Sequence, residues 1–181
     1  MPANTWLGQI FFIDEERMLL DCLISLRAGE RIDEPRAISL GLLALGLVFT
    51  LSGANRIARR YMTKALEHAQ AANDPAAIGV ALFMYGWLQC NEQTWDAAIK
   101  TLERAAEKYV NAGDVLGWGG PTAFLCYFRQ HRGELEEVAR LASELQRLGR
   151  DARVPHLDCW GARPVGAPVW PSDHYRKLRL I

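Results

Sequence analysis

The sequence has 181 residues and half of them are hydrophobic, which is enough for one domain with a core and excludes a disordered chain. Its 21 Lys and Arg residues balance its 21 Asp and Glu residues. A protein that binds nucleic acid through the phosphates needs a surplus of cations, so this balance argues against a general nucleic-acid binder.

The start of the chain and its cysteines indicate a protein of the cytoplasm. Residues 1–9 lack the basic start and apolar run of a secretory leader. The four cysteines form no CxxC or CxH pair, the short spacing that zinc sites normally show. We therefore expect reduced, mostly buried, structural cysteines and no metal. They are Cys22, Cys90, Cys126 and Cys159.

Helical segments of two kinds alternate along the chain. Residues 38–51 carry no charge, but these 14 residues fall short of the roughly 20 that a helix needs to cross a bilayer. The run predicts a buried helix and no membrane span, and residues 80–88 predict another helix that is apolar nearly all round. Residues 57–69, 95–109 and 135–148 instead place apolar residues at helical spacing on one face and charged residues on the other.

A shift of the sequence by 40 residues superimposes these segments. Glu34-Pro35 falls on Asp74-Pro75, and Gly46 falls on Gly86. The period predicts a repeat of two helices, the first apolar and the second amphipathic. Further coincident pairs are Leu42 with Leu82, Ala58 with Ala98 and Ala65 with Ala105.

Local signals predict where these helices begin and end. Ser52 and Thr94 are expected N-caps, and residues 73–75 and 111–114 are expected breaks. The glycine-rich residues 113–120 predict a turn between repeats, with Pro121 starting the next helix. No strand precedes them, so they are not a phosphate-binding loop. In the third unit, residues 149–151 predict that the second helix ends early.

The pattern resembles the tetratricopeptide repeat. Small residues occupy the positions where the two helices of a pair would approach most closely, Gly46 with Ala58 and Gly86 with Ala98. The 40-residue period exceeds the usual 34 and is similar to the longer repeats of large bacterial ATP-dependent regulators of the LuxR and adenylate-cyclase-linked types. The matching residues of one unit are Leu82, Tyr85, Gly86, Trp95, Ala98, Leu102 and Ala105.

The resemblance implies an all-α fold, a right-handed superhelix of antiparallel helix pairs with about four units. We expect this TPR-like α-solenoid to span residues 1–160. The first unit, residues 6–29, fits worst, as a terminal cap would. Residues 161–181 contain three prolines and a basic cluster, Arg176-Lys177-Arg179, and predict an extended or disordered tail.

No set of residues in the sequence indicates catalysis. Residues 14–16, Asp-Glu-Glu, suit the first turn of a helix, where acids meet the positive end of its dipole. Cys126 with His131, and His156 with Cys159, lack a third group that would orient a nucleophile and base. The four histidines show no metal-binding pattern. We therefore expect neither an enzyme nor a cofactor.

In the tetratricopeptide family one face of the first helices lines a concave groove. Carried over residue by residue, that face consists of Leu43, Leu47, Leu51, Phe83, Trp87, Asn91, Ala123, Tyr127 and His131. These residues are either core or an exposed apolar groove that marks an interaction surface. Family members that bind chaperones grip a carboxylate with Lys and Asn on this face. Large apolar residues stand there in this chain, so that ligand class is not expected.

The sequence thus favours a non-catalytic scaffold that binds a protein or peptide on its concave face, as part of a larger signalling or regulatory protein. The alternative is a sensor domain that binds a small effector in an apolar groove. Expected partners include neither nucleic acid nor membrane. The sequence leaves open whether the chain forms a homodimer and whether its C-terminal tail occupies the groove.

Overall fold

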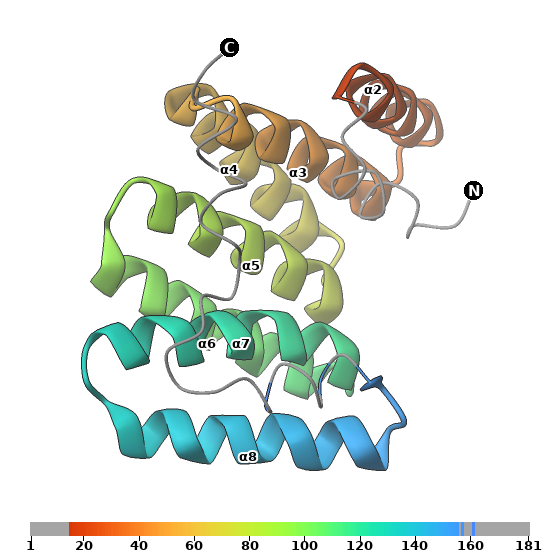
Figure 1. Cartoon of the computed structure of the whole chain (residues 1–181). Helices are drawn as coiled ribbons and strands as arrows, with labels where there is room; N and C mark the ends of the chain where they lie inside the picture. The colour runs from red at the N-terminus through yellow and green to blue at the C-terminus, as the bar shows by residue number, and fades with distance from the viewer. Residues whose placement is uncertain (1–14, 156, 158–160, 162–181) are drawn as a thin grey trace.

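The computed structural model describes residues 15–155, 157 and 161 (Figure 1). Over these residues it contains seven helices and no strand, which confirms the predicted all-α repeat fold. The helices are α2 (Glu15–Ile32), α3 (Pro35–Leu51), α4 (Asn55–Ala71), α5 (Pro75–Asn91), α6 (Trp95–Asn111), α7 (Val115–His131) and α8 (Leu135–Asp151).

The 40-residue period arises from a regular alternation of helix and turn. Each helix from α3 to α8 has 17 residues. The middle residue of each turn has a positive φ angle, a backbone conformation that ends many helices. These residues recur every 20 positions, so one period comprises two helices and two turns. They are Asp33, Gly53, Asn73, Gln93, Gly113, Gly133 and Arg153.

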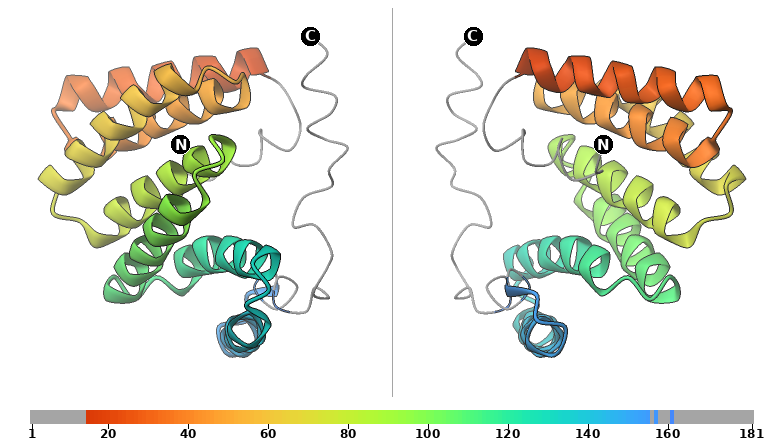
Figure 2. Two further views of the ribbon diagram at one scale, coloured as in Figure 1. Left: turned by 90° about the vertical axis from the view of Figure 1, so that its left-hand side faces the viewer. Right: turned by 90° about the vertical axis from the view of Figure 1, so that its right-hand side faces the viewer.

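The helices form two rows. The inner row consists of α3, α5 and α7, which contact one another in succession (Figure 1). The outer row consists of α2, α4, α6 and α8, and these four make no contact with each other. Because α4 and α6 each pack between two successive inner helices, the pairs stack along one direction, with α2 and α8 at opposite ends (Figure 2).

The core lies between the two rows. One cluster joins α3, α4 and α5 and contains Leu43, Met62 and Leu88. Two others join α6, α7 and α8, with Leu102 and Leu145 fully buried. The hydroxyl of Ser39, also buried, donates to the carbonyl oxygen of Ala65 at 2.8 Å, so this polar group on an inner helix is satisfied.

The small residues of the repeat lie where paired helices touch, as predicted. A Cβ atom on Gly46 would stand 2.7 Å from Cγ of Met62, and one on Gly86 would stand 2.9 Å from Cδ2 of Leu102. Ala58 and Ala98, on the facing outer helices, have no exposed surface. The carbonyl oxygens of these two alanines lie 3.5 Å and 3.7 Å from the same Cβ positions, which confirms the register within each pair.

Only the start of the glycine-rich segment, at Gly113, lies in the predicted turn, and the other glycines belong to α7. Helix α7 begins at Val115, so Pro121 lies inside the helix instead of starting it. The glycines serve packing: a Cβ atom on Gly117 would stand 2.2 Å from Cε1 of Tyr109, and one on Gly120 would stand 3.1 Å from Cε1 of Phe83. Aromatic rings from α6 and α5 therefore take the space that side chains on α7 would fill.

Of three further local predictions, those for Ser52 and for the end of α8 were wrong, and that for Thr94 was confirmed in position. Ser52 ends α3, where its hydroxyl donates to the carbonyl of Phe49 at 3.1 Å, and it does not begin α4. Thr94 occupies the N-cap position of α6, as predicted, but its hydroxyl donates to the carbonyl of Gln89 and makes no cap bond. Helix α8 keeps the common length and ends at Asp151, so the third unit is not shortened.

Two other predictions concern the chain ends and the membrane. Most of residues 161–181 and all of 1–14 lie outside the described residues, so the predicted domain boundary and tail stay predictions. Within the described part of the chain, no helix has both the length and the apolar character needed to span a membrane. The apolar run of residues 38–51 is accordingly a buried inner helix.

Candidate partner-binding face

The predicted groove residues of α3 belong to the core. Leu43 and Leu47 are each 1% exposed, and Leu43 packs in the cluster shared with α4 and α5. Leu51, at the end of α3, is half-buried. Ala123 on α7 is also buried. These buried side chains offer little surface to a partner, so the face accessible to a ligand lies elsewhere on the inner row.

The predicted residues of α5 and α7 are more accessible. Phe83, Trp87 and Tyr127 are half-buried. Asn91 and His131, which end α5 and α7, are exposed. Exposure therefore increases from α3 toward the C-terminal ends of α5 and α7, and the aromatic side chains occupy the intermediate zone.

Phe124, a residue that the sequence analysis did not select, connects the two helices. Its ring lies 5.4 Å from that of Phe83 in an edge-on arrangement and 5.9 Å from that of Trp87. The predicted register chose its neighbour Ala123 because Ala123 is equivalent to Phe83 by the 40-residue shift. The spacing of four between Phe124 and Phe128 places both on one side of α7, and this was the signal available in the sequence.

The aromatic contacts continue across α7 onto α6. The ring of Phe128 lies 5.3 Å from Tyr127 and 5.3 Å from Trp95, and Trp95 is 47% exposed. The ring of Tyr127 lies 4.4 Å from the imidazole of His131. Such edge-on pairs add stability beyond the burial of their surface. We use the name aromatic row for Phe83, Trp87, Trp95, Phe124, Tyr127 and Phe128.

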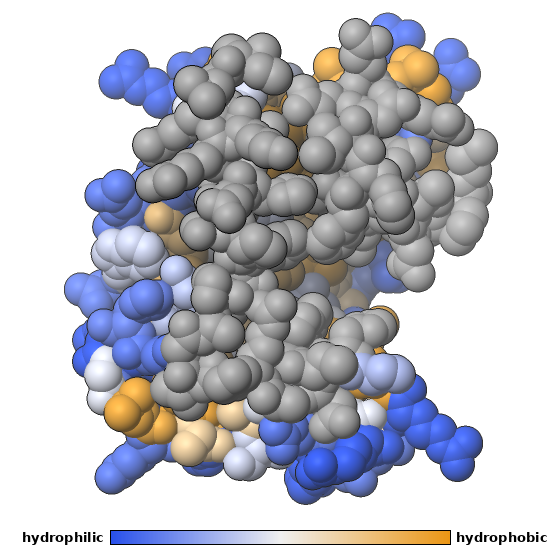
Figure 3. Space-filling model, in the orientation of Figure 1, coloured by the Kyte–Doolittle hydropathy of each residue, from blue (hydrophilic) through white to orange (hydrophobic). Residues whose placement is uncertain are grey.

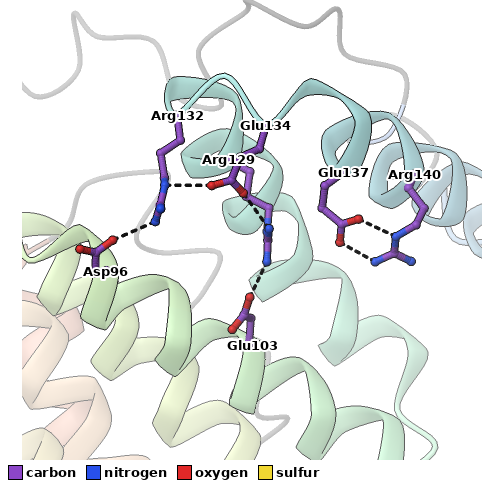
Figure 4. A network of polar contacts seen from close by, with 7 residues as sticks. All are labelled: Asp96, Glu103, Arg129, Arg132, Glu134, Glu137 and Arg140. Atoms are coloured by element: carbon purple, nitrogen blue, oxygen red, sulfur yellow. Dashed lines mark hydrogen bonds and ion pairs between the residues drawn. The ribbon is translucent and has the colours of Figure 1, made fainter.

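A set of ion pairs fixes the end of α7 beside the aromatic row (Figure 4). The guanidinium of Arg129 pairs with Glu103 on α6 and with Glu134, the latter at 2.7 Å. Arg132 pairs with Asp96 at 2.8 Å and with Glu134 at 2.9 Å. Because Arg129 is mostly buried, its pairs are screened less than those on an open surface.

The preceding repeat holds its inner helix in the same way with the charges reversed. Glu92, at the end of α5, pairs with Arg59 on α4, and Arg59 also donates to the hydroxyl of Tyr85 at 3.2 Å. Arg132 stands 40 residues after Glu92, and its partner Asp96 is an acid on α6. The position after the inner helix is thus repeated along the stack with the opposite charge, whereas its partner is not at an equivalent position, because Asp96 corresponds to Arg56 by the 40-residue shift.

The thiols near this face are not activated. Cys90 and Cys126 are free, and burial raises the pKa of the Cys90 thiol to about 12 and that of Cys126 to about 11. Thiols of this kind stay protonated at neutral pH and are poor nucleophiles. Among the described residues, no group of three His, Cys, Asp or Glu side chains is placed to hold a metal ion.

Comparison with known proteins does not assign the chain to a family. No family model, no curated protein and no solved structure matches the chain. The fold and the face therefore define only a structural class, an all-helical repeat whose inner row carries partly exposed aromatic side chains. A function for this face has to be inferred from its chemistry.

Proposed function

We propose that the chain is a tetratricopeptide-like scaffold that binds a protein or peptide through its aromatic row. The observation that carries this proposal is the continuous run of aromatic contacts from Phe83 through Phe124 to Trp95. Its members are half-buried or exposed, apart from the buried Phe128. Side chains held in this way keep a defined position and still present surface to a ligand.

The chemistry of the row suits a peptide with apolar or aromatic anchors. Large aromatic residues dominate the energy of many protein interfaces, and partly exposed apolar surfaces often mark binding sites. Asn91 and His131, exposed at the ends of α5 and α7, supply polar groups that can hydrogen-bond a peptide backbone. We place the centre of the site at Trp87, Phe124 and Tyr127, and leave out the buried Leu43, Leu47 and Ala123.

The resemblance to tetratricopeptide repeats supports the same choice of face. In that family the first helices of the repeats line the concave surface, and α3, α5 and α7 hold the equivalent positions here. Similarity to the long repeats of bacterial LuxR-type and adenylate-cyclase-linked regulators suggests a scaffold within a signalling protein. These repeats serve many partners, so the ligand has to be found by experiment.

The test is selection from a displayed peptide library, followed by affinity measurements on variants of the full chain. Trp87→Ala should weaken the selected peptides about 30-fold, which corresponds to roughly 2 kcal/mol. The matched control is Tyr61→Ala: Tyr61 is also half-buried and stacks on Phe49 at 5.4 Å, but it lies on α4. This control should leave the affinity unchanged.

Two results would count against a peptide site on the aromatic row. Equal loss of affinity in both variants would mean that the selected peptides bind elsewhere or respond to general loosening of the fold. Failure to select any peptide, together with a small molecule retained by the purified protein in native mass spectrometry, would favour the small-effector sensor instead.

A further inference from the structure

The outward face of α2 differs from that of every other outer helix. The repeat places positions 20, 60, 100 and 140 at equivalent points, and these hold Leu20, Arg60, Lys100 and Arg140. The same holds one turn later, where the equivalent residues are Ile24, Lys64, Arg104 and Glu144. At these two positions α4, α6 and α8 carry charged residues, whereas α2 carries aliphatic side chains.

These aliphatic side chains are exposed in the structure. Leu20 is 56% exposed and Ile24 is 57% exposed, and Leu19 and Leu23 are also exposed. Hydrophobic surface is visible at the place of α2, at the upper right of Figure 3. We use the name α2 patch for Leu19, Leu20, Leu23 and Ile24. Arg27, one turn beyond, is exposed and has no ion pair with any described residue.

Extension of the helical stack would not bury the α2 patch. Helix α4 packs between α3 and α5, yet Arg60 and Lys64 remain exposed. The side of α4 that faces its neighbours carries Met62, and the residue of α2 equivalent to Met62 is the buried Cys22. A helix added in the manner of the stack would cover that other side of α2. The α2 patch therefore needs a different cover.

We propose that the α2 patch is the interface of a homodimer in which α2 packs antiparallel against α2 of a second copy. A two-fold axis beside residues 21 and 22 would pair Leu20 with Leu23 of the partner subunit and Leu19 with Ile24 of the partner subunit. Such an interface is self-complementary, so one aliphatic patch suffices to bury both. The inference is independent of the peptide site on the inner row.

The charges on α2 favour a second copy over other apolar partners. Glu15, Glu16 and Arg17 stand before the patch, with a net charge of −1, and Arg27, Glu30 and Arg31 stand after it, with a net charge of +1. In the antiparallel pair, Glu16 of one helix lies opposite Arg27 of the partner subunit, at both ends of the interface. Parallel packing would instead place like charges together, which costs free energy.

Analytical ultracentrifugation of the full chain tests the dimer, with protein from about 1 to about 100 µM, the range of a moderate interface. The wild type should shift from monomer to dimer over this range. The variant Leu20→Arg/Ile24→Lys, which carries the equivalent residues of α4, should stay monomeric at every concentration. Its thermal midpoint should equal that of the wild type at about 1 µM, where the wild type is also monomeric. Ile57→Arg, which replaces an exposed aliphatic residue of α4 outside the patch, should dimerise as the wild type does.

Charge reversal then tests the orientation. Arg27→Glu should weaken the dimer by about tenfold or more, and adding Glu16→Arg to it should restore most of the affinity. A wild type that is monomeric at every concentration would overturn the proposal, as would a dimer that persists in Leu20→Arg/Ile24→Lys. If the wild type is monomeric and the thermal midpoint of Leu20→Arg/Ile24→Lys is much lower than that of the wild type, the chain itself covers the patch. This result would also overturn the proposal.

Discussion

The inner helices α3, α5 and α7 and the outer helices α4, α6 and α8 have the same length but opposite surfaces. Each inner helix starts at an acidic N-cap whose carboxylate accepts backbone N–H groups, and the residues are Glu34, Asp74 and Asp114. The outer helices have no side-chain cap bond and carry a charged face. The difference shows that the apolar or charged character of a helix follows the number of helices packed against it and not its length.

A physical reason connects the caps to the inner row. Helix α5 is apolar on every side, so burial alone fixes neither its rotation nor the residue at which it begins. The carboxylate of Asp74 accepts from the N–H of Ala76 at 2.9 Å and of Ala77 at 3.3 Å, and this cap sets the start. An amphipathic outer helix is already oriented by its single apolar face.

Among the changes that compare the two rows, the largest effect is expected at the contact between them. Ala98 on α6 has no exposed surface and lies opposite Gly86. Ala98→Leu should lower the free energy of unfolding by roughly 1–3 kcal/mol, because the added side chain overpacks the contact. The measurement is urea unfolding followed by circular dichroism.

Ala97→Leu is the control for this comparison. Ala97 precedes Ala98 on the same helix but is exposed, so the same change there should alter the free energy of unfolding by less than about 0.5 kcal/mol. Equal urea midpoints for the two variants would contradict the close contact between α5 and α6.

A smaller effect should separate the caps of the two rows. Asp74→Ala removes the cap of α5 and the ion pair with Arg36 at 3.2 Å, and should cost about 1 kcal/mol. Thr94→Ala, at the uncapped start of α6, should cost less. Asp74→Asn keeps an acceptor for the cap without the charge, so its loss of stability should lie between those of Asp74→Ala and Thr94→Ala. A larger loss in Thr94→Ala than in Asp74→Ala would contradict the difference between the rows.

The repeat itself could be predicted from the sequence because its signals are local. The 40-residue shift aligns Gly46 with Gly86 and Ala58 with Ala98, and the structure places these pairs at the helix contacts. Proline is frequent at the first position of a helix, so Pro121 predicted a helix start that the structure places at Val115 instead. The glycines before Pro121 belong to α7, where Gly117 and Gly120 pack against the rings of Tyr109 and Phe83, and such contacts are not visible in the local sequence.

The candidate face could be predicted only in part. The register selected the partly exposed Phe83, Trp87 and Tyr127 of the inner row, but it could not tell them from the buried Leu43 and Leu47. All five are large apolar residues at equivalent positions of a helix. Their exposure depends on how closely α3, α5 and α7 pack, which is a property of the assembled stack. Whether the face binds a partner remains a prediction.

The most direct test of the aromatic row as a binding surface is to compare Trp87→Ala with Leu88→Ala in urea unfolding. Leu88 is fully buried in the core of α5, and its truncation should cost about 2–5 kcal/mol. Trp87 is half-buried against Phe124, so its truncation should cost about 1–2 kcal/mol of stability while it weakens binding of the selected peptides about 30-fold. A loss of about 3–5 kcal/mol in Trp87→Ala, as for a core tryptophan, would contradict its role as a surface anchor.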